Sequence, residues 1–249
     1  MSRPVVAGNW KMNMTISQSV DLVSRMRLEL DSIDGAEKII CPPFTSLSRI
    51  SDIIEGTSIN LGAQNMHYEE KGAYTGEIAP DMISEICTHV ILGHSERRQY
   101  FNEKDEDVNR KVKSAIKVGL KPIICVGENL NQRESGMAQS IVEGQLRSGL
   151  LDVSDISQIY VAYEPIWAIG TGVSASVQDA GEMMGFIRGT LQSILSGDAS
   201  SGVSLLYGGS VNANNISDYV QNENIDGVLV GGASLDPDSF VSISRQISR

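Results

Sequence analysis

Cysteine and long apolar runs are scarce in this chain of 249 residues. The three cysteines, Cys41, Cys87 and Cys125, form no CxxC pair, and their odd number cannot all enter internal disulfides. We therefore expect buried thiols in a reducing compartment rather than a metal site. No apolar run approaches the roughly 18 residues of a membrane span. The first residues also lack the features of a secretory signal, so we expect a cytoplasmic protein.

Positive charge is also in short supply. The chain has 20 Lys and Arg against 31 Asp and Glu, a formal net charge of −11 at pH 7. Nucleic acids and anionic membranes are bound through clustered Lys and Arg, so neither is an expected partner. The chain has no G-x-G-x-x-G or P-loop motif, so we expect no nucleotide cofactor. An anionic substrate would need local positive charge or backbone N–H groups to hold it.

Eight short apolar runs recur along the chain, and most of them are continuous rather than alternating. This pattern is typical of strands covered on both faces, as in a parallel sheet. The runs span residues 4–7, 38–41, 58–61, 90–92, 122–126, 159–162, 203–206 and 228–230.

The segments between these runs carry apolar residues at spacings of three and four, which predicts helices with one core-facing side. The first such stripe is formed by Ile16, Val20, Val23, Met26 and Leu30. Eight strand–helix alternations in about 250 residues suit one closed α/β domain, a (β/α)₈ barrel over residues 1–249, although an open doubly wound sheet has the same pattern.

Two further helices carry terminal signals. One is predicted to begin in the acidic turn at 105–107 and to stop at Gly119. The other is predicted to follow Ser176, which with Asp179 resembles a capping box that lacks the usual Glu or Gln. The connection from Asn65 to Pro80 shows no clear periodicity, and we expect a loop of this length to form an oligomer contact.

Catalytic candidates are the polar residues that follow the runs, because a parallel barrel collects its active site at the carboxyl ends of its strands. Glu164 follows the sixth run, where a carboxylate is either a base or a salt-bridge partner. The stiff segment 165–167 and the small residues 168–172 after it resemble a lid with two hinges. Closure of this apolar lid would remove water from Glu164 and raise its basicity.

His94 precedes a predicted helix start at Ser95, where the positive end of the helix dipole disfavours imidazolium. The neutral ring could then donate a hydrogen bond to a substrate, and a histidine that only caps its own loop is the alternative. His67 and His89 lack such neighbours, and we interpret both as structural or surface residues.

Lys11 follows the first run beside Asn9 and is a natural cation for an anionic substrate, although most lysines are simply solvated. Gly-Gly pairs occur at 208–209 and 231–232, and Ser210 follows the first pair. They are either tight turns or the backbone donors with which barrel enzymes bind phosphate beside their last two strands. Phosphate held by neutral donors would fit the acidic chain.

Eight segments together resemble the triosephosphate isomerase family, in order and with family-like spacing. They are GNWKMN (8–13), GAQN (62–65), YTGEI (74–78), LGHSERR (92–98), CVGE (125–128), YEPIWAIGTG (163–172), YGGSV (207–211) and VGGASL (230–235). The resemblance implies a TIM-barrel aldose–ketose isomerase of glycolysis and gluconeogenesis that uses neither cofactor nor metal. It would interconvert dihydroxyacetone phosphate and D-glyceraldehyde 3-phosphate by proton transfer through an enediolate.

The same resemblance implies roles for single residues. Glu164 would move the proton between two carbons, and neutral His94 would shuttle protons at the two oxygens. Lys11 and Asn9 would bind the substrate and stabilise the developing negative charge. Glu96 would orient the lysine.

The resemblance also implies a phosphate site and a homodimer. The phosphate would be bound by Gly170, Ser210, Gly231 and Gly232. The long loop with Thr75 would insert into the partner subunit near the lysine of the partner's site.

One departure from the family concerns the lid. After WAIGTG the family often continues Lys-Thr-Ala, whereas this chain has Val173 and Ser174 before Ala175, so the second hinge has altered chemistry. Two other functions are an isomerase of a larger phosphosugar and a catalytically silent barrel that binds phosphometabolites. The joint presence of Asn9, Lys11, His94 and Glu164 speaks against both.

Overall fold

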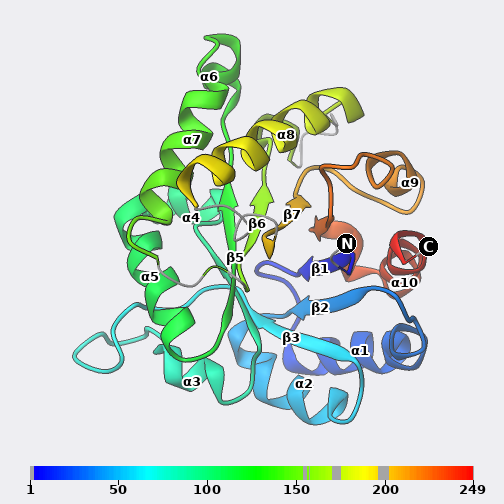
Figure 1. Ribbon diagram of the computed structural model, residues 1–249. Helices are drawn as coiled ribbons and strands as arrows, with labels where there is room; N and C mark the ends of the chain where they lie inside the picture. Colours follow the sequence, from blue (N-terminus) through cyan, green and yellow to red (C-terminus); the bar gives the residue numbers. More distant parts are fainter. Residues whose placement is uncertain (1–2, 154–155, 157, 170–174, 196–201, 249) are drawn as a thin grey trace.

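The protein folds as a closed barrel of parallel strands with helices around it (Figure 1). The structure is a computed structural model that describes residues 3–153, 156, 158–169, 175–195 and 202–248. Within these residues eight strands pair in sequence order, and β8 closes the barrel on β1. The strands are β1 Val5–Asn9, β2 Glu37–Cys41, β3 Ile59–Ala63, β4 His89–Leu92, β5 Lys121–Val126, β6 Tyr160–Tyr163, β7 Ser204–Tyr207 and β8 Gly227–Val230.

Helices form the outer layer. They are α1 Ile16–Asp31, α2 Leu47–Ile54, α3 Pro80–Ser84, α4 Ser95–Tyr100, α5 Asp105–Lys117, α6 Leu130–Glu134, α7 Ala138–Gly149, α8 Val177–Ile194, α9 Ile216–Tyr219 and α10 Pro237–Ile247. Short 3₁₀ turns are η1 Phe44–Ser46, η2 Ile166–Ala168 and η4 Gly232–Leu235. Among the described helices, none combines the length and the apolar character that a bilayer crossing demands.

The closed α/β barrel predicted from the sequence is confirmed, and the open doubly wound sheet is excluded because β1 pairs with both β2 and β8. Each apolar run overlaps one strand, and their ends differ by at most two residues. β1 continues past Ala7 to the polar Asn9, which still pairs with Cys41 of β2. Hydrogen bonds between β1 and β2 set the end of β1, and the apolar pattern of the sequence does not reveal them.

Two apolar cores hold the barrel together. Residues that point inward, such as Ala7, Ile39 and Leu229, fill the barrel itself. Outward residues of the strands pack against the helices in a larger core. All three cysteines are buried and free, as expected. Burial on both faces is the reason why the strands read as continuous apolar runs.

The predicted helix signals are confirmed at α5 and α8. α5 begins at Asp105, and Ser176 Oγ accepts the N–H of Asp179 at the start of α8. The predicted core-facing stripe of α1 is wrong at one residue, because Ile16 is 48% exposed. Ile16 is the first residue after the Thr15 cap, and the buried side of α1 begins one turn later at Ser19.

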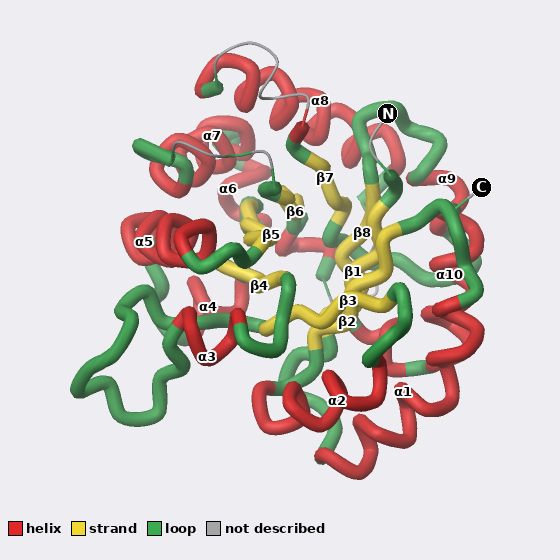
Figure 2. Tube along the Cα trace, turned by 60° about the horizontal axis from the view of Figure 1, so that its bottom comes forward, coloured by secondary structure: helices red, strands yellow, loops and turns green. Residues whose placement is uncertain are grey.

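The connection from β3 to α3 stands away from the barrel as a projecting loop in both views (Figures 1 and 2). Most residues between 69 and 77 are exposed. A hydrogen bond closes the base of the loop, since His67 N–H donates to Ile78 O at 2.8 Å. The loop is therefore an ordered extension whose surface a single chain leaves uncovered.

Candidate active site

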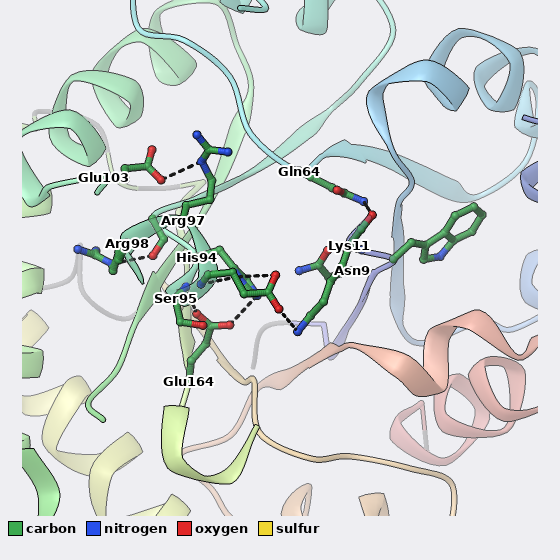
Figure 3. A network of polar contacts seen from close by, with 12 residues as sticks. Asn9, Lys11, Gln64, His94, Ser95, Arg97, Arg98, Glu103 and Glu164 are labelled. Atoms are coloured by element: carbon green, nitrogen blue, oxygen red, sulfur yellow. Dashed lines mark hydrogen bonds and ion pairs between the residues drawn. The ribbon is translucent and has the colours of Figure 1, made fainter. Parts of the chain in front are cut away.

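Four of the predicted residues meet in one hollow at the carboxyl ends of the strands. The hollow has a volume of about 390 Å³ and is lined by Asn9, Lys11, His94 and Glu164. Asn9 ends β1, His94 follows β4 and Glu164 follows β6. Figure 3 shows these side chains converging from separate strands.

A carboxylate and an imidazole are in direct contact at the floor of this hollow. His94 Nε2 lies 2.8 Å from Glu164 Oε1, and both side chains are almost fully buried. The backbone N–H of Ser95 donates to the other oxygen, Oε2, at 2.9 Å. Both oxygens of Glu164 are thus engaged by the loop that begins α4.

The position of His94 at the start of α4 fixes its tautomer. Its Nδ1 accepts the backbone N–H of Glu96 at 3.2 Å, so Nδ1 carries no proton and Nε2 is the N–H that faces Glu164. Burial lowers the pKa of His94, whereas the Glu164 charge raises it, and the net direction is upward. We favour the neutral ring nevertheless, because a second proton on Nδ1 would oppose the Glu96 N–H at the helix terminus.

Opposing effects also act on the carboxylate. Burial raises the pKa of Glu164, but His94, the Ser95 N–H and Lys11 lower it, and the lowering prevails. The effects of His94 and Ser95 depend on direct contact with Glu164. A Glu164 carboxylate that left His94 and stayed buried would have a higher pKa and be a stronger base.

Lys11 is held in place at both ends. Its backbone is in the left-handed region with φ of 52°, where its N–H donates to Asn9 Oδ1 at 3.0 Å. Its Nζ lies 2.7 Å from Glu96 Oε1. Such strain at a residue with a side chain persists only where the surroundings hold it.

Gln64 supplies part of that support and had no role assigned from the sequence. Its Nε2 donates to the carbonyl oxygens of Lys11 and Cys41, both at 2.8 Å. The signal in the sequence was the GAQN segment after the third run, which places Gln64 at the carboxyl end of β3. Figure 3 shows the contact with Lys11.

The first part of the predicted lid is held by a buried carboxylate. Glu128 accepts hydrogen bonds from Tyr163 Oη at 3.0 Å and from Trp167 Nε1 at 2.9 Å. The lid continues into residues 170–174, so Gly170 and the hinge residues Val173 and Ser174 lie outside the described residues.

The predicted phosphate residues that the structure describes line the same hollow. They are Ser210, Gly231 and Gly232. The Ser210 hydroxyl donates to Ala168 O at 2.8 Å, which links the loop after β7 to the start of the lid. Gly231 directly precedes η4, where the first N–H groups of the helical turn have no partner within the turn.

The other two histidines lie outside this hollow. His89 is buried at the start of β4, where its ring approaches Glu37 and Thr88. His67 lies between Tyr68, on which it stacks, and the tilted ring of Tyr74 in the projecting loop, with ring centroids 4.4 Å apart in both pairs. Across the described ranges, no group of three or more His, Cys, Asp or Glu side chains is arranged to hold a metal ion.

Fold and site together define a barrel enzyme with acid–base chemistry. A buried carboxylate touches an imidazole beside a fixed cation, at the end of the barrel where such enzymes react. This arrangement suits proton transfer on a small anionic substrate without covalent attachment.

Comparison with known proteins gives the family. The sequence profile described as "Triosephosphate isomerase" matches residues 4–247. The chain is 53% identical over 246 residues to the triosephosphate isomerase of Dehalococcoides mccartyi strain CBDB1, covering 99% of this chain and 97% of that protein. It is 51% identical to the one of Caldanaerobacter subterraneus subsp. tengcongensis, covering 98% and 99%.

A solved structure agrees with the sequences. The crystal structure of triosephosphate isomerase from Bartonella henselae is similar with a TM-score of 0.92 and 38% identity, and each chain is covered completely. The protein belongs to the triosephosphate isomerase family.

Proposed function

We propose that this enzyme interconverts dihydroxyacetone phosphate and D-glyceraldehyde 3-phosphate through an enediolate, without a cofactor. Family membership supports the substrate, a triose phosphate. The observation that carries the chemistry is the contact of 2.8 Å between His94 Nε2 and Glu164 Oε1 in a hollow that also contains Lys11.

In the proposed mechanism, Glu164 removes a proton from the carbon beside the carbonyl group, and electrons move onto the carbonyl oxygen. The same carboxylic acid returns a proton to the neighbouring carbon. One proton also passes from the substrate hydroxyl oxygen to the former carbonyl oxygen by way of His94 Nε2, so the isomerisation needs no co-reactant. A substrate would displace Glu164 from His94, which removes the interactions that lower its pKa. Glu164 would therefore be most basic when substrate is bound.

His94 and Lys11 would stabilise the enediolate. The Nε2–H of His94 points into the site and can hydrogen-bond to the two substrate oxygens, while its Nδ1 is occupied by the Glu96 N–H. The ammonium of Lys11, oriented by Glu96 and backed by Asn9, would offset the negative charge that develops.

Neutral donors would bind the phosphate, which fits a chain with a net charge of −11. Ser210 and the backbone N–H groups of Gly231 and Gly232 line the hollow, and Gly170 is proposed to complete the set from the lid. Because the Ser210 hydroxyl donates a hydrogen bond to Ala168 O, it would also couple phosphate binding to the lid segment.

A homodimer is proposed as the working form, with the projecting loop inserted into a second copy through Thr75. A second hollow of about 430 Å³ adjoins the active site and shares Asn9 and Lys11 with it. Exposed apolar side chains lie on or near this hollow and on the loop, namely Met12, Phe44, Tyr74 and Phe101. Coverage of this hollow by the loop of a second copy would bury them and shield the lysine from water.

The family's place in glycolysis supports a cytoplasmic location, which we also propose. The decisive experiment is a coupled assay of D-glyceraldehyde 3-phosphate isomerisation on the purified protein, with a larger aldose phosphate assayed in parallel. We expect turnover of the triose phosphate only. A folded protein that binds the triose phosphate without turnover would instead establish a silent binding barrel.

A further inference from the structure

The segment at the carboxyl end of β5, residues 126–128, supports the backbone of Glu164, the proposed catalytic base. Beyond the last paired residues of the strands, Glu164 N–H donates to Val126 O at 2.7 Å and Ile166 N–H donates to Glu128 O at 3.1 Å. The segment 126–128 therefore continues the ladder alongside 164–166. The backbone position of Glu164 depends on where this segment lies.

Gly127, in the middle of that segment, touches Glu164 directly. A Cβ atom added at Gly127 would overlap the carbonyl oxygen of Glu164 and come within 2.7 Å of its carbonyl carbon. No side chain separates the two backbones, so a displacement of Gly127 is passed on to the catalytic residue.

The N–H and C=O groups of Gly127 itself have no strand to pair with. In a parallel ladder alternate residues bond to opposite neighbours, so Gly127 would bond toward β4. β4 ends at Leu92, which is paired with Ile124 further back along β5. The buried backbone groups of Gly127 consequently need another partner.

One side chain of α7 supplies it. Gln145 Oε1 accepts the Gly127 N–H at 2.8 Å, and Gln145 Nε2 donates to Gly127 O at 3.1 Å. The amide group thus takes the place of a missing strand residue, with one acceptor and one donor. α7 packs against β5 from outside the barrel, so it is a fixed support.

We propose that Gln145 is a positioning residue for the isomerase reaction, acting on Glu164 through Gly127. This inference rests on the proposed function. Loss of the Gln145 amide leaves two buried backbone groups of Gly127 unpaired. The segment 126–128 then shifts toward other hydrogen-bond partners. Misplacement of a catalytic group by about 1 Å can cost on the order of 10²-fold in rate.

The test compares two variants that each remove an amide with two hydrogen bonds to backbone. Gln145→Met keeps the length of the side chain but removes both contacts with Gly127. The matched control is Asn109→Leu, because Asn109 Nδ2 donates to Gly149 O and Leu151 O at 3.0 and 2.9 Å, away from the hollow. Circular dichroism and urea unfolding are measured on both, with steady-state kinetics on D-glyceraldehyde 3-phosphate.

We expect kcat of Gln145→Met to fall about 10- to 100-fold with KM within about threefold of the wild type. Asn109→Leu should lose stability to a comparable extent and keep kcat within about twofold. A folded Gln145→Met protein with wild-type kcat would show that the amide only stabilises the fold and would overturn the proposal. An inactive wild-type protein would overturn the proposed function itself and this inference with it.

A second variant settles the matter if Gln145→Met fails to fold. In Gln145→Glu the carboxylate still accepts the Gly127 N–H but repels Gly127 O, whereas the protonated acid can serve both groups. Partial burial and the nearby Gly127 O disfavour the charged carboxylate and raise its pKa above the ordinary value of about 4.3. The ratio of its kcat to that of the wild type should therefore rise as the pH falls from about 7 to 5, a titration that a merely structural role would not impose on turnover. A ratio independent of pH would contradict the inference.

Discussion

His94 Nε2 lies 2.8 Å from Glu164 Oε1, although the two residues come from the ends of different strands. In the proposed mechanism the substrate oxygens would enter between the two side chains. Binding would then separate the pair and remove interactions that lower the pKa of Glu164. Substrate entry and activation of the proposed base would thereby be one event.

The first prediction concerns the base. Glu164→Gln removes the group that carries the proton but keeps its size and most of its hydrogen bonds. We expect a normal circular dichroism spectrum and a loss of kcat of about 10²–10⁴-fold, as is usual for a general base. The control is Glu143→Gln, which alters an exposed ion pair with Arg147 and should leave kcat unchanged. Turnover near the wild-type rate in Glu164→Gln would rule out the assignment.

The second prediction concerns the cation. Lys11→Met should lower kcat/KM by roughly 10²–10³-fold, because a fixed charge beside the developing oxyanion is lost in a strongly acidic protein. Lys113→Met, which neutralises an exposed lysine of α5, tests whether net charge alone matters. Steady-state kinetics at fixed ionic strength provide the measurement. Equal effects of the two variants would mean that Lys11 acts only through the overall charge.

The third prediction concerns assembly. Shortening the loop within residues 65–78, or the point change Thr75→Arg at its exposed tip, should produce monomers with little activity. Light scattering gives the oligomeric state, and the isomerase assay is run on the same sample. Ser24→Arg, on the exposed side of α1, introduces the same charge elsewhere. A fully active monomer would refute the role of the loop.

The fourth prediction concerns pH and a polar cluster at the amino ends of the strands. Glu37 accepts a hydrogen bond from Tyr160 Oη at 2.8 Å, and His89 Nε2 and Lys121 Nζ lie 3.3 and 3.7 Å from its Oε1. The other ring nitrogen of His89 is 2.7 Å from Thr88 Oγ1. Burial raises the pKa of Glu37, but these neighbours outweigh it and bring the pKa to about 2. Burial lowers the pKa of His89 below 6.5, against the opposing effect of Glu37.

Both shifts destabilise the fold in acid. Below pH 6.5 the unfolded chain protonates His89 more readily than the native protein does, and between pH 4.5 and about 2 the same holds for Glu37. We expect His89→Gln to flatten the fall in unfolding free energy between pH 6.5 and 5, measured by urea at one protein concentration. His67→Gln is the control, and equal slopes in all three proteins would contradict the prediction.

Particular residues show how far the sequence led. The apolar runs located every strand, and polar residues at their ends indicated Asn9, Lys11, His94 and Glu164 before any geometry was known. Helix signals were reliable where a cap or acidic turn marked them, as at Ser176 and α5. The core-facing side of α1 was misjudged at Ile16, because a residue next to a helix cap projects beyond the packed turn.

The hydrogen bonds that support the candidate site could not be predicted from the sequence pattern. Gln64 and Gln145 are ordinary glutamines in the sequence, and only the barrel brings one to the carbonyl of Lys11 and the other to both backbone groups of Gly127. Hydrogen bonds between residues so far apart in the chain depend on the register of the strands and the placement of the helices. Neither leaves a local periodic signal.

The sequence by itself determined the repeated strand–helix pattern, the buried faces and the chemical groups at the strand ends, because these follow from local periodicity and residue type. The tertiary structure alone decided that the barrel closes, that Glu164 contacts His94 and the Ser95 N–H, and that Lys11 is held in a left-handed conformation between Asn9 and Glu96. The physical reason is that closure of the ladder fixes residues from distant strands within hydrogen-bonding distance, where burial and neighbouring charges then set their pKa values.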